Sequence, residues 1–273
     1  MSSATALRHQ IEHALESRFP AALSPAPRTI RNVATTGIEE ADRLLEGGLP
    51  VGAISEIAGP DSSGRTSLAL AFVAQRTAEE RVCAWVDAND AFDPESAAAS
   101  GVNLGRLLWV RCQDLSAAQQ ACASEKSAAK KSVSGEAKPS TRPWTRLDQA
   151  LRATDLLLQA GGFASIVLDL GDTAPEHGNR IPLATWFRLR QAADRTRCSL
   201  VVLGKAPYAQ SSAALALECA PLRAEAAGGT VLRGFTYEVR RGRQRFSPFA
   251  QGARKPPAST WSATSSWEAE KRA

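Results

Sequence analysis

The chain has few cysteines, no long apolar run and little excess charge, and each absence excludes a class of protein. Its five cysteines are odd in number and scattered without C-x-x-C spacing. Neither a disulfide framework nor a zinc site is therefore expected, and the thiols fit buried apolar strands. No run reaches the roughly 18 consecutive apolar residues of a membrane span, and the first residues lack the apolar segment and cleavage site of a secretory signal. We therefore expect a cytoplasmic protein without membrane contact.

The 273 residues, 44% of them hydrophobic, suffice for one core of ordinary size with appendages. We expect an N-terminal helix and linker over residues 1–34, a core over residues 35–249 and a flexible C-terminal tail over residues 250–273. Within the core, residues 113–146 are rich in Ala, Ser and Lys without apolar periodicity, which indicates a mobile insertion. The net charge of +5 permits contact with nucleic acid or acidic proteins without establishing either.

The core alternates between short apolar runs and segments with helical spacing. The runs are continuous rather than alternating, which is typical of parallel strands covered by helices on both faces. This pattern predicts an α/β fold with a twisted, mainly parallel sheet. The expected strands are 53–57, 82–87, 107–110, 166–170 and 200–203, and the expected helices are 37–45, 66–79, 147–159 and 183–196.

Residues 59–70, GPDSSGRTSLAL, have the form of a phosphate-binding loop. In the pattern G-x-x-x-x-G-K-[ST], glycines let backbone N–H groups close around the phosphates, the lysine reaches the β and γ oxygens, and the hydroxyl binds Mg²⁺. The glycines and the hydroxyl are in register here, but an arginine stands at the lysine position. The expected nucleotide-binding residues are Gly59, Asp61, Ser62, Ser63, Gly64, Arg65, Thr66 and Ser67.

Three segments resemble the ATPase core of RecA-type recombinases: the GLP-x-G turn, the GP-x-SSG loop and the run DANDAFDP. The resemblance covers residues 35–249 without the insertion and ends in FTYEVRRGRQRFSPF, where we expect a β-hairpin. It implies a RecA-like P-loop fold with ATP and Mg²⁺ as cofactors. It also implies that Thr66 and Asp169, the latter as the Walker B aspartate, hold the metal.

The departures from the family pattern gather around one phosphate. Recombinases carry a glutamate directly after the DA pair, which orients the attacking water, and this chain has Asn89; an amide cannot take the proton of that water. Asp90 would point to the opposite face of a strand unless the strand has already ended. Gly204 and Lys205 replace the polar amide that senses the γ-phosphate, and Arg65 does not occupy the volume of an ammonium group. We therefore expect no catalytic residue and weak or vestigial binding of ATP and Mg²⁺.

The segments that correspond to the DNA-contacting loops of recombinases, 171–182 and 206–212, are short and carry one arginine, Arg180, and no lysine. Basic residues gather later, interleaved with aromatic residues on the expected hairpin. Two interpretations stay open: this region binds DNA, or its charge protects a solvated edge strand. The candidate DNA-binding residues are Arg240, Arg241, Arg243 and Arg245.

Two tryptophans, Trp261 and Trp267, stand out in the C-terminal tail. Exposed tryptophan is unusual outside binding surfaces. The pair indicates either a short partner-binding motif or a segment that packs back onto the core.

The degraded catalytic positions resemble those of the ImuA subgroup, RecA-like proteins of translesion mutagenesis cassettes. The resemblance implies a non-recombinogenic accessory or scaffold protein of damage-induced translesion DNA synthesis in the SOS response. Its partners would be a Y-family polymerase homologue and RecA, with DNA as a further ligand. Two alternatives stay open: an active DNA-dependent ATPase of the RecA superfamily, and a SulA-like inhibitor of cell division. The largely intact phosphate loop argues against the second.

Overall fold

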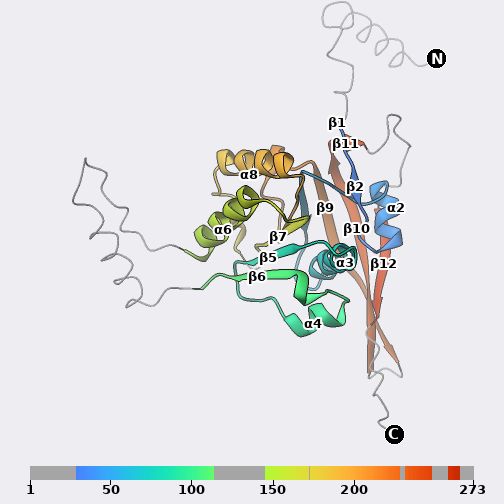
Figure 1. Cartoon of the computed structure of the whole chain (residues 1–273). Helices are drawn as coiled ribbons and strands as arrows, with labels where there is room; N and C mark the ends of the chain where they lie inside the picture. Colours follow the sequence, from blue (N-terminus) through green and yellow to red (C-terminus); the bar gives the residue numbers. More distant parts are fainter. Residues whose placement is uncertain (1–28, 114–144, 172, 228–230, 248–257, 265–273) are drawn as a thin grey trace, which may run out of the picture.

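The computed structural model describes residues 29–113, 145–171, 173–227, 231–247 and 258–264. The main sheet consists of β4 (Ile54–Ala58), β5 (Cys83–Asp87), β6 (Leu107–Arg111), β7 (Ser165–Asp169), β8 (Ser199–Gly204), β9 (Leu215–Ala227), β10 (Val231–Gln244) and β12 (Ala258–Thr264). Their order across the sheet is β12-β10-β9-β4-β8-β7-β5-β6 (Figure 1). The strands from β9 to β6 are parallel, whereas β10 is antiparallel to both β9 and β12.

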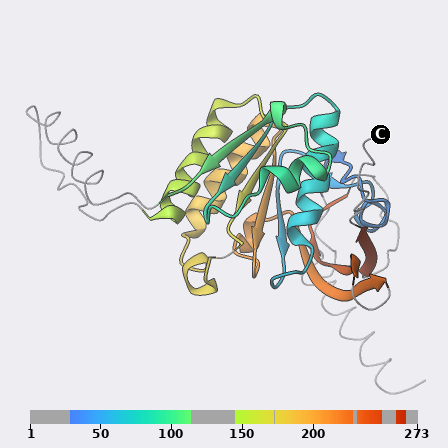
Figure 2. The ribbon, with the colours of Figure 1, turned by 90° about the horizontal axis from the view of Figure 1, so that it is seen from below.

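Helices cover both faces of this sheet (Figures 1 and 2). On one face, α2 (Glu39–Leu45) and α3 (Arg65–Ala78) share a core with strand residues such as Val201. On the other face, α6 (Arg146–Ala160) and α8 (Leu183–Thr196) share a second core with residues such as Leu200. Because successive strand residues are buried on opposite faces, the strands read as continuous apolar runs. The predicted α/β fold is confirmed.

Short elements complete the described chain. They include the two-residue strands β1 (Thr29–Ile30), which pairs with β11 (Phe246–Ser247), and β2 (Val33–Ala34), which pairs with β3 (Leu49–Pro50). The end of the expected N-terminal linker is therefore paired with the core. The expected N-terminal helix and most of the expected insertion lie outside the described residues. The remaining helical segments are α4 (Pro94–Ala99), α7 (Pro175–Gly178), η1 (Leu104–Arg106) and η2 (Gln210–Ser212).

The C-terminal strands differ from the sequence-based expectation. The hairpin joins β9 to β10, with its paired ends at Ala227 and Val231. The hairpin was expected within FTYEVRRGRQRFSPF, but this run belongs to the single strand β10 as far as Gln244. Residues 258–264 were expected in a flexible tail, and they instead form β12 along β10. The expected C-terminal hairpin is therefore present, but its turn lies between β9 and β10. The expectation of a flexible tail is wrong for residues 258–264, because their strand character comes from pairing with β10.

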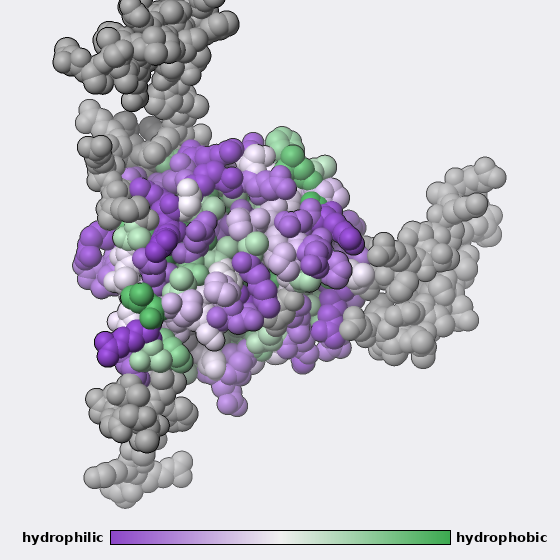
Figure 3. Space-filling model, turned by 180° about the vertical axis from the view of Figure 1, so that it is seen from behind, coloured by the Kyte–Doolittle hydropathy of each residue, from purple (hydrophilic) through white to green (hydrophobic). Residues whose placement is uncertain are grey.

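The described surface and interior agree with the expectations from composition. Cys83, Cys112, Cys198 and Cys219 are free and buried. No helix within the described ranges is both long enough and apolar enough to cross a bilayer. In Figure 3, one face of the molecule is mostly hydrophilic, and its apolar residues form small separate groups. The described residues of that face therefore form no broad apolar patch of the kind found at interfaces.

Candidate nucleotide site

The phosphate loop connects β4, in the middle of the sheet, to the N-terminus of α3. Ser62 and Gly64 have left-handed backbone angles, with φ of 59° and 82°. At Gly64 a Cβ atom would lie 2.7 Å from the ring of Tyr237 on β10, and at Gly59 it would collide with the carbonyl oxygen of Cys219 on β9. Both glycines of the motif are therefore required by strands that pack against the loop, as well as by the turn itself.

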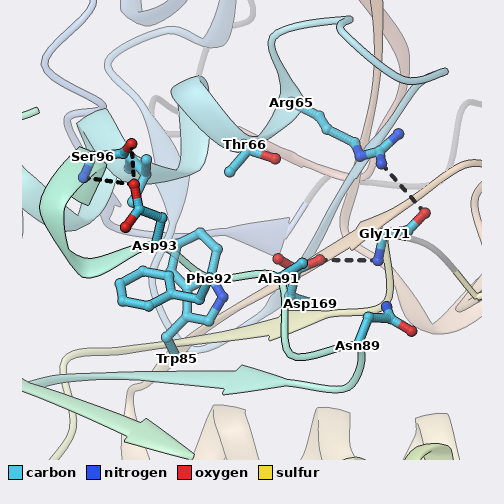
Figure 4. Close-up of a pocket in the computed structure, with 11 residues that line it drawn as sticks. Arg65, Thr66, Trp85, Asn89, Ala91, Phe92, Asp93, Ser96, Asp169 and Gly171 are labelled. Atoms are coloured by element: carbon cyan, nitrogen blue, oxygen red, sulfur yellow. Dashed lines mark hydrogen bonds between the residues drawn. The ribbon is translucent and has the colours of Figure 1, made fainter. Parts of the chain in front are cut away.

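Arg65 turns its guanidinium group back onto the loop. It donates hydrogen bonds to the carbonyl oxygens of Gly59 and Pro60, the latter at 3.0 Å, and to Gly171 at 3.3 Å. It also lies 3.3 Å from a carboxylate oxygen of Asp61. Figure 4 shows the side chain directed toward Gly171 and away from Thr66. The rigid planar fork thus cross-links the loop to the end of β7, a geometry that a lysine ammonium group cannot reproduce.

A pocket of about 250 Å³ opens beside the loop. Its lining includes Thr66 from α3 and Asp169 from the end of β7, together with an apolar wall that contains Trp85 and Phe92, whose ring centroids lie 4.9 Å apart (Figure 4). The hydroxyl of Thr66 and the carboxylate of Asp169 are hard oxygen donors of the kind that Mg²⁺ prefers. The two predicted metal-binding residues are therefore brought to one pocket, and their chemistry fits a magnesium ion.

Burial raises the pKa of Asp169 to about 6 from its ordinary value of 3.8, and the nearby Asp87 carboxylate adds to this effect. A hydrogen bond from the backbone N–H of Gly171, 2.9 Å long, and the charge of Arg65 act in the opposite direction. The parallel register places Asp87 beside Asp169, at the ends of β5 and β7. Two carboxylates at adjacent strand ends make this edge of the sheet attractive for a cation.

The raised pKa of Asp169 predicts how stability depends on pH. Between pH 3.8 and about 6 the folded chain binds more protons than the unfolded chain, so its stability falls as the pH rises through this range. Asp169→Asn removes the titration. From pH 4 to pH 7, the free energy of unfolding of the variant should therefore gain roughly 2 kcal/mol relative to wild type. Urea denaturation at both pH values measures the difference.

Asp90→Asn is the matched control for this measurement. The pKa of Asp90 is lowered by its hydrogen bond with Arg111, so only the tail of its unfolded-state titration, near pH 3.8, falls within this range. Its difference from wild type should therefore change by less than about 0.3 kcal/mol. A constant difference for Asp169→Asn as well would contradict the assignment of a raised pKa to Asp169.

The carboxylates of the DANDAFD segment all have structural partners. Asp87 accepts hydrogen bonds from the backbone N–H groups of Asn89, Ala91 and Phe92 at 2.9–3.1 Å, and so folds the chain after β5. Asp90 forms two hydrogen bonds with Arg111, at 2.7 and 2.9 Å. Asp93 caps α4 through backbone and hydroxyl donors.

Asn89 is the residue of this segment that lines the pocket at the predicted glutamate position. The strand ends at Asp87, so the strand-face argument against Asp90 does not apply. Asp90 is paired with Arg111 on the neighbouring strand β6, and this pairing keeps Asp90 from acting as a base. Therefore none of the described residues that line the pocket has a free carboxylate at the position expected for the water-orienting group.

Asn89 also lines a neighbouring cavity of about 670 Å³. This cavity lies between the start of α6 and the segment after β7, and its basic residues are Arg146, His177 and Arg180. Among the described residues, its lining contains no tryptophan, tyrosine or phenylalanine that could stack on bases. Whether single-stranded DNA is contacted here stays a prediction.

The loop after β8 is fixed by a buried glutamate that sequence reasoning missed. Glu56 on β4 accepts hydrogen bonds from the backbone N–H groups of Tyr208 and Ala209, both at 2.5 Å. Burial raises the pKa of Glu56. The next residue after β8, Lys205, lies 3.2 Å from a carboxylate oxygen of Asp61 in the phosphate loop. A single charged residue within an apolar strand was the available sequence signal for Glu56.

The four candidate DNA-binding arginines do not form one exposed row. Arg241 points to the α2 face, where it lies 3.5 Å from the carbonyl oxygen of Leu44. Arg243 donates to the carbonyl oxygen of Gln210 and lies 3.8 Å from Glu56 on the other face. Arg240 pairs with Glu238 at 2.8 Å, and Arg245 donates to the carbonyl oxygen of Ser211 at 3.0 Å. These arginines tie β10 to its surroundings, and DNA binding through them stays a prediction.

Trp261 is buried rather than available to a partner. Its side chain is 6% exposed, and its ring centroid lies 4.8 Å from that of Tyr237, the residue opposite it on β10. Tyr237 in turn covers Gly64. The partner-binding interpretation of Trp261 is therefore wrong, and the alternative, packing onto the core, is right. Trp267 lies outside the described residues.

A parallel sheet whose middle strand passes through a glycine loop into a helix, with an aspartate at the end of a nearby strand, defines a P-loop α/β domain of the RecA type. The RecA N-terminal domain family matches residues 10–126. The crystal structure of the RadB recombinase aligns with a TM-score of 0.54 at 17% identity, and the alignment covers 84% of this chain and 94% of that one. The fold is therefore RecA-like.

Curated relatives agree with this class. Protein RecA of Nostoc sp. is 39% identical over 104 residues, which cover 38% of this chain and 29% of that protein. Protein RecA of Allorhizobium ampelinum is 29% identical over 190 residues, which cover 64% of this chain and 44% of that protein. The chain thus spans less than half the length of these relatives. The matches show a partial sequence similarity to RecA proteins.

Proposed function

We propose that this chain is a non-recombinogenic RecA-like accessory protein of damage-induced translesion DNA synthesis. It acts by binding other proteins in the cytoplasm and has a degenerate nucleotide site. This proposal rests on the surroundings of the two altered residues, Arg65 and Asn89. Arg65 is engaged by oxygens of the loop and of Gly171, and Asn89 stands on the pocket wall where a carboxylate is needed.

The site retains features that suit binding better than hydrolysis. Thr66 and Asp169 would hold Mg²⁺, which would supply charge neutralisation to bound phosphates. The N-terminus of α3 presents backbone N–H groups toward the loop. Asn89 can position a water molecule through its amide but cannot accept a proton from it. We therefore propose that ATP is bound weakly and that its hydrolysis contributes little to function.

The proposed partners are a Y-family polymerase homologue and RecA. The similarity of residues 10–126 to the RecA N-terminal domain supports a RecA-like surface. DNA is a further proposed ligand. Its role is a supporting one, because the candidate arginines already contact other residues of this chain.

A direct test measures protein binding and phosphate release on the same preparation. Surface plasmon resonance should detect binding to purified RecA or to the polymerase homologue, and Thr66→Ala should leave this binding within about twofold. Phosphate release with ATP and single-stranded DNA should stay at background. DNA-stimulated release that Thr66→Ala abolishes would replace the proposal with an active DNA-dependent ATPase. Failure to bind either protein would contradict the proposed partners.

A further inference from the structure

Two cations of the phosphate site share one carboxylate. In the loop, Asp61 Oδ1 lies 3.3 Å from Arg65 Nη2, and Asp61 Oδ2 lies 3.2 Å from Lys205 Nζ. Lys205 directly follows β8, whose last residue pairs in register with the end of β4, immediately before the loop. The carboxylate therefore bridges a cation of the loop and a cation of the neighbouring strand end.

These charges differ in their access to solvent. The Asp61 side chain is 68% exposed and that of Lys205 is 34% exposed, whereas that of Arg65 is 10% exposed. The pKa of Asp61 is lowered, mainly by its hydrogen bond with Lys205 and by the charge of Lys205, with a smaller contribution from Arg65. An anionic solute can thus reach the Asp61–Lys205 pair without opening the core.

We infer that Lys205 is a phosphate-binding residue of this site and that Asp61 competes with phosphate for Lys205 and Arg65. The inference rests on the proposed nucleotide site. Carboxylate and phosphate oxygens accept charge-assisted hydrogen bonds from the same donors. A phosphate group that reaches the loop must therefore displace the Asp61 carboxylate from at least one cation, and it also meets the repulsion of that carboxylate.

The exchange has a physical consequence for affinity. Lys205 provides a flexible point charge, which can leave a carboxylate and follow a phosphate oxygen by rotation of its side chain. Arg65 is held by three backbone oxygens and has less freedom to move. Lys205 is therefore the cation that exchanges partners, and Asp61 is the group that keeps polyphosphate affinity low.

Isothermal titration calorimetry with ATP and with inorganic pyrophosphate tests this inference on the full chain. Asp61→Asn keeps the shape of the side chain and removes its charge. It should tighten both ligands about tenfold, because a unit of repulsion close to a multiply charged ligand is lost. Glu39→Gln is the matched control, since Glu39 is also an exposed acid paired with an arginine, and it should leave both affinities unchanged.

Lys205→Gln in the Asp61→Asn background separates two roles of the lysine. If Lys205 binds phosphate, this second change should weaken both ligands by about tenfold. If Lys205 only pairs with Asp61, it should have no effect, which would overturn the inference. A gain on Asp61→Asn that is confined to ATP would also overturn it, because the phosphates would then not carry the effect.

The outcomes also separate this inference from the proposed function. If neither wild type nor Asp61→Asn binds ATP or pyrophosphate at millimolar concentration, the phosphate exchange is overturned and the protein-binding proposal stays intact. Tight binding of ATP by wild type with no gain on Asp61→Asn would likewise overturn the inference. Circular dichroism and a denaturation curve for each variant exclude misfolding as the cause.

Discussion

Purified wild-type protein should release phosphate from ATP at background rate. Arg65 occupies the lysine position of the loop, and Asn89 occupies the position of the carboxylate that orients water. Loss of one preorganised electrostatic contact of this kind costs about 2.7 to 4 kcal/mol, or a factor of about a hundred to a thousand in rate. A malachite-green assay with and without single-stranded DNA measures the rate. Turnover comparable to that of a recombinase would contradict the assignment of both positions.

Restoring activity should require both positions together. Arg65→Lys releases Gly171 from its hydrogen bond with the guanidinium group but leaves no base, and Asn89→Glu supplies a base but leaves the guanidinium group in the loop. Because the two groups act on one transition state, their effects should be strongly non-additive. The double variant should therefore exceed either single variant by at least about a hundredfold.

Asp90→Asn in the double-variant background is the control for this experiment. Asp90 is paired with Arg111, so removing its charge should leave the restored rate within about twofold. Robust hydrolysis by Arg65→Lys alone would show that Asn89 does not occupy the water-orienting position. A rate that depends on Asp90 would identify that carboxylate as the base.

The parallel part of the fold could be predicted because its strands have a recognisable local sequence pattern. Strands covered on both faces are apolar in their interiors, and β5, β7 and β8 are such runs apart from polar residues at their ends. The meeting of Thr66 and Asp169 in one pocket follows from the same logic, since parallel strands present their carboxyl ends at one edge. The two residues that the family resemblance assigns to the metal therefore line one pocket, and metal binding itself stays a prediction.

The inner contacts of the site could not be predicted in this way. The sequence shows that Arg65 differs from lysine, but its hydrogen bond to Gly171 joins residues 106 positions apart. Asp87 and Asp90 have equal carboxylates, and their different roles depend on where β5 ends and on Arg111 of the neighbouring strand. Such roles arise from packing between elements, which no local pattern encodes.

The C-terminal segment shows the same limit most clearly. Residues 258–264, ASTWSAT, contain small and hydroxyl residues with one aromatic, and their composition resembles that of a loop. Their strand character comes from pairing with β10, and a single tryptophan provides most of their burial in the core. Counting hydrophobic residues therefore underestimates the tendency of this segment to form a strand of the sheet.

Replacing Trp261 should be among the most destabilising substitutions in the chain. Trp261→Ala removes a large buried ring from its contact with Tyr237 and leaves a cavity behind it. Such truncations cost about 3–5 kcal/mol, a large part of the 5–15 kcal/mol that stabilises a typical domain. Chemical denaturation followed by circular dichroism should show this loss in the free energy of unfolding. Leu222→Ala, at a side chain that is 58% exposed on β9, is the control and should change it by less than about 0.5 kcal/mol.

Trp261→Ala should also affect the phosphate loop. Tyr237 lies between Trp261 and Gly64, the residue before the start of α3. Without the tryptophan, the tyrosine ring loses the support on its outer side, so the loop should become less ordered and weaken its binding of ATP. Trp261→Phe keeps an aromatic contact and should retain most of both properties. Unchanged stability in Trp261→Ala would show that residues 258–264 behave as a dispensable tail, and the loop would then depend on Tyr237 alone.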